Sequence, residues 1–377
     1  MSNTWKSDLP KVLLLHAYSP RNSGDGLLVE LARESVLKAV GPADIRVIAS
    51  DAEAFGGPAY HQWNAPLLDK WNKVPRRLSM LATGFLGGSR VFREMAQEAD
   101  LIVAVGGGYL RGDALVPAIK SWGAHFGQLR LAASQGHKSV YLPQSIGPFH
   151  GVYKRAMQKN LSKIRTVYAR DDRSVSEFAA VSSLQRMPDM AVLELAESPA
   201  GAKRPQNLSA RPIFVARELS NPRNYYNLLE EVARSEEFEW ALQSTGGGND
   251  DYPLTSRLSP AEPRSMKTVL AEPAARIVVS TRLHGALSSL IAGFPAIHLS
   301  YERKGWGAYE DLGLDQFVLN ARDATLPQIN DLLAQIRTHP EDFWATIDAK
   351  RQDIRALHGS LISNMRTVAS LQSTSGD

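Results

Sequence analysis

Two side chains that could bind an anion and exchange a proton, Arg282 and His284, stand two positions apart. They follow a short apolar run, 276–280, and precede residues with helical spacing, so we expect them in a turn where a helix begins. A helix N-terminus presents unpaired backbone N–H groups and the positive end of the helix dipole. A guanidinium, an imidazole and this terminus predict a site for an anion that must also exchange a proton.

A structural role is the plain alternative for His284, because Leu287 and Ile291 fall on the same helical face and could hold a core histidine there. The neighbouring Arg282 favours the functional interpretation, since titratable groups that gather in one turn more often mark sites than packing.

Other candidate residues follow predicted strands or begin predicted helices. Gly107 and Gly108 would allow close backbone approach to a ligand, although the triglycine lacks the spacing of a nucleotide-binding loop and could be a simple tight turn. Arg170 ends another strand and could equally belong to an exposed charge cluster. Asn22 and Asp25 begin a helix, where both residue types are ordinary caps. Ligands of open parallel sheets bind beyond the carboxyl ends of the strands, where these loops gather.

Strand and helix patterns alternate along the whole chain, which predicts an α/β fold. The Pro- and Ala-rich stretch 198–211 is the best interdomain linker. We therefore predict two Rossmann-like domains that face each other across a cleft, a GT-B-like arrangement. The first covers 1–197 and the second 212–345, and a C-terminal helix over 346–377 packs back on the first domain. Thr325 is a plausible N-cap of the helical end of the chain.

The composition narrows the class of protein. The chain of 377 residues has no cysteine, a net charge of +4 and ordinary hydrophobic and charged fractions. These features exclude disulfides and cysteine chemistry and disfavour nucleic-acid binding. No apolar run is long enough for a transmembrane helix and no secretory signal is visible, so the cytoplasm is the expected compartment. The histidines lack metal-ligand spacing and the Asp250-Asp251 pair has no third ligand nearby, so no metal site is predicted.

The stretch 51–93 mixes basic and aromatic residues. Two interpretations stay open for it: a helix packed on its own domain, and peripheral contact with the inner face of a membrane or with an acceptor.

Taken in order, several motifs make the chain resemble the polysaccharide pyruvyl transferase family. They occupy 22–25, 106–110, 143–148, 169–174, 280–284 and 300–304. The resemblance implies a GT-B-like fold and a reaction that uses phosphoenolpyruvate as donor. The pyruvyl group becomes a cyclic ketal on two hydroxyls of a sugar and phosphate leaves, with neither a metal nor another cofactor. The acceptor would be a sugar of an exopolysaccharide or cell-surface glycan, or a lipid-linked oligosaccharide precursor.

The resemblance also implies roles for the candidate residues. Arg282 and Arg170 would hold the two ends of the donor, from the donor and acceptor domains respectively, with Lys304 as a third cation. His284 would protonate the donor as general acid. Asp25 would bind or deprotonate the acceptor hydroxyl. The remaining candidate substrate-binding residues are Asn22, Gly107, Gly108, Gln144 and Arg217.

Two other functions remain open from the sequence. A GT-B glycosyltransferase would use a nucleotide sugar instead of phosphoenolpyruvate. A non-catalytic binding protein with a decayed site is the second, and the joint presence of Arg170, Arg282 and His284 counts against it. The acceptor sugar, its hydroxyl pair, the ketal stereochemistry and the oligomeric state are not determined by the sequence.

Overall fold

The computed structural model describes residues 5, 8–55, 57, 59–61, 90–112, 121–198, 204, 208, 210–246, 250–259, 261–274 and 276–373. By its internal contacts the chain divides into two compact units, which are described separately here. Unit 1 comprises Met1–Pro20, Leu28–Met190 and Leu357–Asp377, and unit 2 comprises Arg21–Leu27 and Ala191–Ala356. The predicted domain boundaries, with their acceptor and donor sides, stay a prediction. Most of 51–93 and of the linker 198–211 lies outside the described residues.

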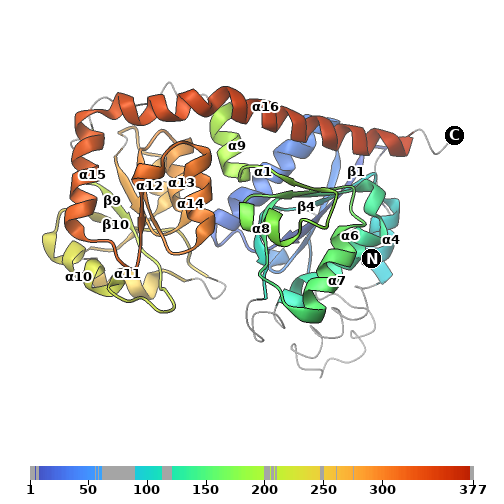
Figure 1. Cartoon of the computed structure of the whole chain (residues 1–377), viewed down its shortest axis with the longest axis horizontal. Coiled ribbons are helices and arrows are strands. Elements are labelled where there is room, and N and C mark those ends of the chain that lie inside the picture. Colours follow the sequence, from blue (N-terminus) through green and yellow to red (C-terminus); the bar gives the residue numbers. More distant parts are fainter. Residues whose placement is uncertain are drawn as a thin grey trace. The chain divides into compact units, whose positions relative to one another are not determined.

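The sheet of unit 1 is parallel throughout and has the order β3-β2-β1-β4-β6-β7-β8, with β5 beside β6. Figure 1 labels two of its neighbouring strands, β1 and β4. Its first strand is the apolar run Lys11–Ala17, buried from its second residue onward, as a strand covered on both faces should be. The strands are β1 (Lys11–Ala17), β2 (Asp44–Ala49), β3 (Ala59–His61), β4 (Leu101–Ala104), β5 (Gly107–Leu110), β6 (Ser139–Ile146), β7 (Thr166–Ala169) and β8 (Leu184–Arg186). The triglycine therefore leads into a short strand, β5, where the sequence suggested only a turn or loop.

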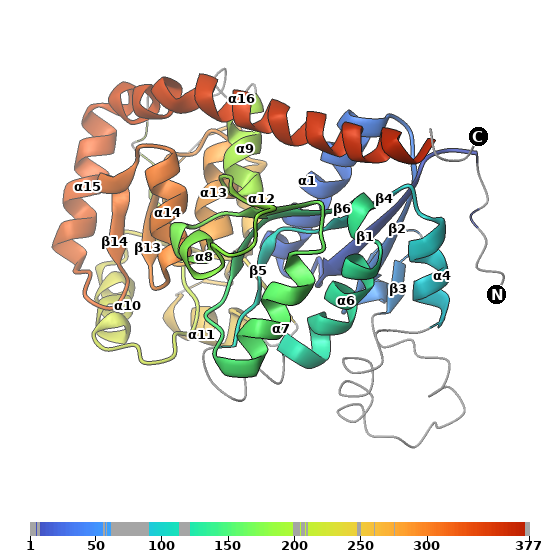
Figure 2. The ribbon, with the colours of Figure 1, turned by 45° about the vertical axis from the view of Figure 1, so that its right-hand side comes forward.

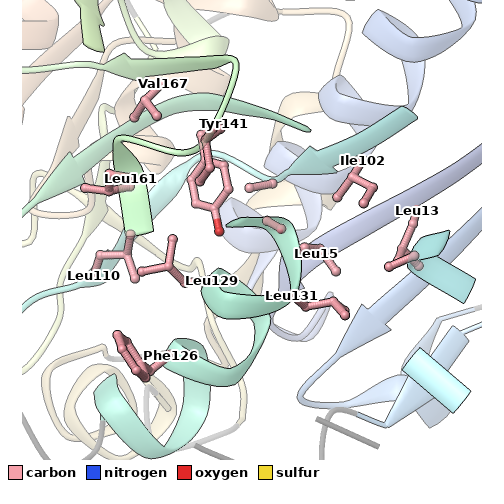
Figure 3. Close-up of a cluster of buried hydrophobic side chains, with 14 of the residues drawn as sticks. Leu13, Leu15, Ile102, Leu110, Phe126, Leu129, Leu131, Tyr141, Leu161 and Val167 are labelled. Carbon is pink, nitrogen blue, oxygen red and sulfur yellow. The ribbon is translucent and has the colours of Figure 1, made fainter. Parts of the chain in front are cut away.

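The helices of unit 1 bury the apolar face of the sheet. Figure 3 shows part of this core, to which β1 contributes Leu13 and Leu15 and the helical segment that follows β5 in the chain contributes Phe126 and Leu129. The helices are α1 (Ser23–Val40, from Leu28 onward), α4 (Arg90–Glu98), the π-helix Trp122–Phe126, α6 (Gly127–Ser134), α7 (Gly151–Leu161) and α8 (Asp172–Glu177).

Unit 2 has a second parallel sheet in the order β11-β10-β9-β12-β13-β14. This is the doubly wound order 3-2-1-4-5-6. The first three strands are added toward one edge of the sheet and the last three toward the other, so the strand order reverses between the first and the fourth strand. The strands are β9 (Ile213–Val215), β10 (Glu239–Leu242), β11 (Arg264–Ser265), β12 (Val278–Ser280), β13 (Ala296–Ser300) and β14 (Val318–Asn320). Here the reversal falls between β9 and β12, so a ligand crevice is expected where these two strands end.

The helices of unit 2 are α9 (Met190–Glu197), α10 (Tyr225–Ser235), α11 (Tyr252–Leu258), α12 (Met266–Leu270), α13 (Leu283–Ile291), α14 (Arg303–Asp311) and α15 (Leu326–Thr338). Thr325 caps α15 in a capping box with Gln328, as the sequence suggested. The last helix, α16 (Pro340–Ser373), belongs to unit 2 as far as Ala356 and to unit 1 from Leu357. None of the described helices combines the length and apolar character needed to cross a bilayer.

A buried polar cluster lies at the carboxyl end of β1 in unit 1. His16 has a left-handed φ of 65°, uncommon for a residue with a side chain, and its N–H donates to Gln128 Oε1 at 2.7 Å. Its ring bonds His125 (Nδ1 to Nδ1, 3.2 Å) and the Tyr141 hydroxyl (2.9 Å) and stacks on Tyr109. Burial lowers the pKa of His16, and it lowers the pKa of His125 to about 4. Both rings are therefore neutral in the folded chain at neutral pH.

These two histidines make the stability of unit 1 depend on pH. Below about pH 6.5 the unfolded chain binds protons that the folded chain refuses, so stability falls as the pH drops toward 4. We expect His125→Gln to keep a partner for His16 and to reduce this slope by about 1.4 kcal/mol per pH unit. Urea unfolding at several pH values between 4.5 and 7.5 measures the slope. The exposed His137→Gln should leave it unchanged, and an equal slope in both variants would contradict the assignment.

Candidate active site

The candidate residues of unit 2 gather where the strand order of its sheet reverses, between β9 and β12. Arg217 follows β9, Arg282 follows β12, and Lys304 lies just beyond β13. Because β9 and β12 are adjacent and parallel, their carboxyl ends deliver Arg217 and Arg282 to the same edge. Thr281 fixes the turn between them, since its N–H donates to Val215 O at 2.9 Å and its side chain bonds the Tyr225 hydroxyl.

Arg282 is the N-cap residue of α13 and is buried, with 7% of its surface exposed. Its Nε donates to Asp251 Oδ2 at 3.0 Å, and its Nη2 makes a short contact with Asp251 Oδ1. Asp251 is itself 1% exposed and also accepts from the N–H of Ser244. Burial raises the pKa of Asp251 and the guanidinium opposes that rise. A two-point ion pair in the interior fixes the plane of the guanidinium.

His284 lies in the first turn of α13 and faces the start of another helix. A Cβ placed on Gly24 would stand 2.8 Å from His284 Cβ and 2.9 Å from its Nδ1, so only glycine permits this approach. The start of α1 is held there by Ser23, whose N–H and hydroxyl both donate to Gln243 O. The segment Arg21–Leu27 belongs to unit 2 for this reason. Two helix N-termini, those of α1 and α13, therefore meet at His284.

Asp25 adds a carboxylate to this group. Burial raises its pKa, and the nearby His284, the Asn22 hydrogen bond, Lys304 and Arg282 all act in the opposite direction. Asn22 orients the carboxylate, because its Nδ2 donates to Asp25 Oδ2 at 2.7 Å while its Oδ1 caps α1 through Gly24 N. A buried carboxylate that is surrounded by cations and an imidazole can accept or release a proton under the influence of a ligand.

The remaining two cations are both held by neighbours. Lys304, in the first turn of α14, pairs with Glu302 at 2.9 Å and is half-buried. Arg217 contacts the Tyr301 hydroxyl and lies over the Tyr301 ring, 5.0 Å from its centre. Tyr301 and Lys304 both follow β13, so one loop positions the two cations.

A neutral histidine, His298, lies next to this loop and binds the end of β12. His298 on β13 is buried and its Nδ1 lies 2.8 Å from Ser280 O, which fixes the end of β12 just before Arg282. Burial lowers the pKa of His298 to about 4. His298 is therefore an uncharged donor to the backbone rather than another cation.

Gln243, which the sequence analysis did not single out, lies beneath the first turn of α13. It is 4% exposed, and within the described chain neither atom of its amide has a hydrogen-bond partner. Its Oε1 would stand 2.8 Å from a Cβ on Gly285, so the amide lies against the backbone of the helix start. Leaving a buried amide unpaired costs about 1–3 kcal/mol, which makes Gln243 a candidate ligand-binding group.

Unit 1 holds the other candidates in a second group. Arg170 is 3% exposed; its Nη1 makes a short ion pair with Asp189 and its Nε donates to Ser145 Oγ at 3.1 Å. A Cβ on Gly108 would stand 3.2 Å from Arg170 Nη2, so the glycine strand β5 passes close over the guanidinium. Arg170 is therefore built into the interior, and the exposed charge cluster considered from the sequence does not describe it.

Gln144 lies beside this arginine on β6. It is completely buried, and neither of its amide atoms finds a hydrogen-bond partner among the described residues. Its backbone pairs with Gly107 on one side and receives the Arg170 N–H on the other. Gly107, Gly108, Gln144 and Arg170 thus form one group at the carboxyl edge of the sheet in unit 1.

The structure thus brings the sequence candidates together in two sets, one in each unit. His284, Arg282, Asn22, Asp25, Arg217 and Lys304 lie in unit 2, and Arg170, Gly107, Gly108 and Gln144 lie in unit 1. Sequence reasoning missed Gln243, and it considered Asp251 only to reject a metal site, without identifying it as the partner of Arg282. The one sequence feature that could have indicated Asp251 is its place in the loop that follows a predicted strand. Among the described residues, no three His, Asp or Glu side chains gather as a metal site requires.

Comparison with known families matches residues 22–303 to the polysaccharide pyruvyl transferase model. The match covers most of the chain, and the chain belongs to this family of transferases. It includes both sets of candidate residues except Lys304, which is the next residue. No curated protein sequence matches the chain.

Two solved structures are similar to the chain along most of its length. A UDP-GlcNAc 2-epimerase from Neisseria meningitidis, bound to UDP-GlcNAc, is similar over 96% of this chain and 99% of its own, with a TM-score of 0.50 and 11% identity. The glycosyltransferase SnogD from Streptomyces nogalater matches over 98% and 100%, with a TM-score of 0.45 and 17% identity. At this identity the first likeness shows the fold alone. It confirms the predicted class, two parallel α/β sheets of GT-B-like type.

The buried pair of Arg282 and Asp251 should dominate the stability of its surroundings. Asp251→Ala would leave a guanidinium buried without its carboxylate, which typically costs about 3–5 kcal/mol. Glu230→Ala, which removes an exposed ion pair on α10, should cost less than about 1 kcal/mol. Urea unfolding of both variants tests this difference. Arg282→Met combined with Asp251→Ala should recover part of the loss, and simple additivity of the two single variants would argue against the pair.

Proposed function

We propose that the protein transfers the pyruvyl group of phosphoenolpyruvate to two hydroxyls of a sugar, as a cyclic ketal. The acceptor would belong to an exopolysaccharide or cell-surface glycan, free or as a lipid-linked precursor. Family membership supports the reaction class. The observation that carries the assignment of residues is the grouping of Arg282, His284, Asp25 and Lys304 around two helix N-termini in unit 2.

The donor carries a phosphate and a carboxylate, so it needs several fixed cationic or N–H donor groups. Arg282 offers a guanidinium whose plane is fixed by Asp251, and Lys304 offers a more mobile ammonium. The start of α13 adds backbone N–H groups and a positive dipole. These groups support binding of the donor in unit 2. Arg217, held by Tyr301 at the same edge, is a further candidate for the second anionic group.

The reaction requires a proton on the methylene carbon of the donor. In the proposed first step His284, as the imidazolium, gives its proton to that carbon, and the neighbouring carbon becomes a cationic centre bonded to the phosphate oxygen. An acceptor hydroxyl attacks this centre, and Asp25 or the now neutral His284 takes its proton. The second hydroxyl then attacks, the carbon–oxygen bond to phosphate breaks, and phosphate leaves with the remaining proton.

The donor would add net negative charge to this group. The cations nearby are each matched by a carboxylate, Arg282 by Asp251 and Lys304 by Glu302. A multiply charged donor would therefore place uncompensated negative charge beside the imidazolium that the first step requires, and the two opposite charges would attract each other.

For the acceptor we propose the group in unit 1. Gln144 has an amide with no partner among the described residues, and such a group suits a sugar hydroxyl, which both donates and accepts.

Arg170 is held by Asp189 and Ser145, so it can present a fixed cation without paying the entropy of ordering a free side chain. It is the proposed second anchor of the donor.

Phosphate release tests the reaction directly. With phosphoenolpyruvate and a panel of sugar acceptors, release should require both substrates and yield one phosphate per ketal. A coupled phosphate assay and mass spectrometry of the sugar measure the two products. Binding of a nucleotide sugar, with no release from phosphoenolpyruvate for any acceptor, would instead support a glycosyltransferase and reject the proposal.

His284→Gln separates proton transfer from binding. Loss of a general acid should lower kcat by roughly 10²–10⁴-fold while the Kd of phosphoenolpyruvate, measured by calorimetry, changes little. In D₂O the wild-type product should carry one deuterium in its methyl group. Near-normal kcat in the variant would remove His284 from the mechanism. Ser288→Ala, one turn after His284 on α13, is a matched control that should keep full activity.

A further inference from the structure

A long stretch of the chain contains no acidic residue. Between Asp113 and Asp171 there are nine lysines and arginines and no aspartate or glutamate. The chain as a whole has 39 acidic residues in 377, so about six would be expected in a stretch of this length. The positive charge of the protein is therefore concentrated in one part of unit 1, although the overall net charge is only +4.

Two of these cations are structural. Lys138 is buried and its Nζ donates to the carbonyl oxygens of Gln97 and Ala99, and Arg170 pairs with Asp189. Most of the others lie on α7 or just after it. Arg155, Lys159, Lys163 and Arg165 are exposed, and no ion pair joins them to a carboxylate within the described part of the chain.

The helix α7 presents these charges on one face. Val152, Arg155 and Lys159 follow one another at spacings of three and four, so they share the solvent side, while Met157 and Leu161 face the core. Figure 2 shows α7 beside α6 on the outside of unit 1, and the two helices pack together. We call the exposed residues Val152, Arg155, Lys159, Lys163 and Arg165 the α7 face.

Val152 is the feature that a merely solvated basic helix does not explain. It is 72% exposed, although valine is usually buried, and it stands in the first turn of α7. An exposed apolar side chain beside a row of cations is suited to contact with a lipid surface, which offers partners to both kinds of group. The cations meet anionic headgroups, and the apolar group enters the layer beneath them.

Nucleic acid is a less suitable partner for this face. Binding of single strands depends on aromatic side chains that stack on bases. The nearest large aromatics, Trp122 and Tyr153, pack edge to face against each other, and Trp122 also stacks on Phe126. Both are partly buried and pack against the core of unit 1, and Val152 offers no stacking surface.

We propose that the α7 face docks the protein peripherally on a bilayer that contains anionic phospholipids. The start of α7 follows β6, so Val152 lies at the carboxyl end of the sheet in unit 1, the edge that carries Gln144. Docking there brings this edge to the level of the headgroups. The inference stands independently of the proposed chemistry, because it predicts binding to lipid in the absence of either substrate.

Co-sedimentation with vesicles tests the proposal. The full chain should bind vesicles of phosphatidylcholine with 30% phosphatidylglycerol, lose binding at high salt, and not bind pure phosphatidylcholine. Arg155→Gln with Lys159→Gln should weaken binding by roughly thirty-fold, since each cation near an anionic surface contributes about 1 kcal/mol, or about fivefold. Adding Val152→Ser to this double variant should weaken binding further at low salt, because the apolar contact with the lipid layer is then also lost. Arg257→Gln with Lys267→Gln, two exposed cations of unit 2, is the matched control and should bind as the wild type does.

The outcomes distinguish this proposal from its alternatives. Equal binding by the α7 and control variants, or no binding to either kind of vesicle, would overturn it. Binding to heparin without binding to vesicles would also overturn it, by assigning the face to a soluble polyanion. The α7 double variant should keep wild-type affinity for phosphoenolpyruvate in calorimetry, so a failed vesicle experiment and a failed proposed function remain separate results.

Discussion

The buried ion pair between Arg282 and Asp251 is the constraint on which the candidate site of unit 2 depends. It joins the turn after β12 to the loop after β10 and fixes a guanidinium at the start of α13. Without the carboxylate, Arg282 would bring an uncompensated charge into the interior beside Lys304, His284 and a positive helix terminus. Such a group of cations is tolerable only when each has a fixed counter-charge. The positions of the charged side chains in the site therefore depend on this balance of positive and negative charge as well as on packing.

The sequence predicted the two sheets because buried parallel strands are continuous apolar runs separated by helices, as β1 and β4 are. It also predicted Arg282 and His284, because two titratable residues in one turn form a local signal. It could not predict the Asp251 partnership, since that contact spans thirty-one positions and depends on how the loop after β10 folds. Nothing in the sequence distinguishes Asp251 from its neighbour Asp250, but their environments differ: Asp251 is buried and Asp250 exposed.

Long-range contacts also explain why Asp25 lies in unit 2, although its place early in the chain falls within the predicted first domain. Its segment is bound to unit 2 through Ser23 and Gln243, and Gly24 makes that approach possible by lacking a side chain. Glycine, serine and aspartate at a helix start have ordinary capping explanations, so nothing local distinguishes this segment from any other N-terminus. In the same way, Gly107–Leu110 forms a strand because β6 continues past its pairing with β4 and its last residues pair with β5, which is a property of the sheet and not of the glycines.

Each unit has one buried glutamine beside its candidate residues whose amide has no partner within the described chain. Gln144 belongs to β6 and Gln243 directly follows β10; both are at least 96% buried, and in the described chain neither amide has a partner. A folded protein would gain about 1–3 kcal/mol by replacing either with an apolar residue of similar size, unless the amide acts on something outside the chain. Each stands at the carboxyl edge of a parallel sheet, where α/β proteins bind their ligands. Their cost to stability is therefore the expected physical signature of polar groups that are kept for a substrate.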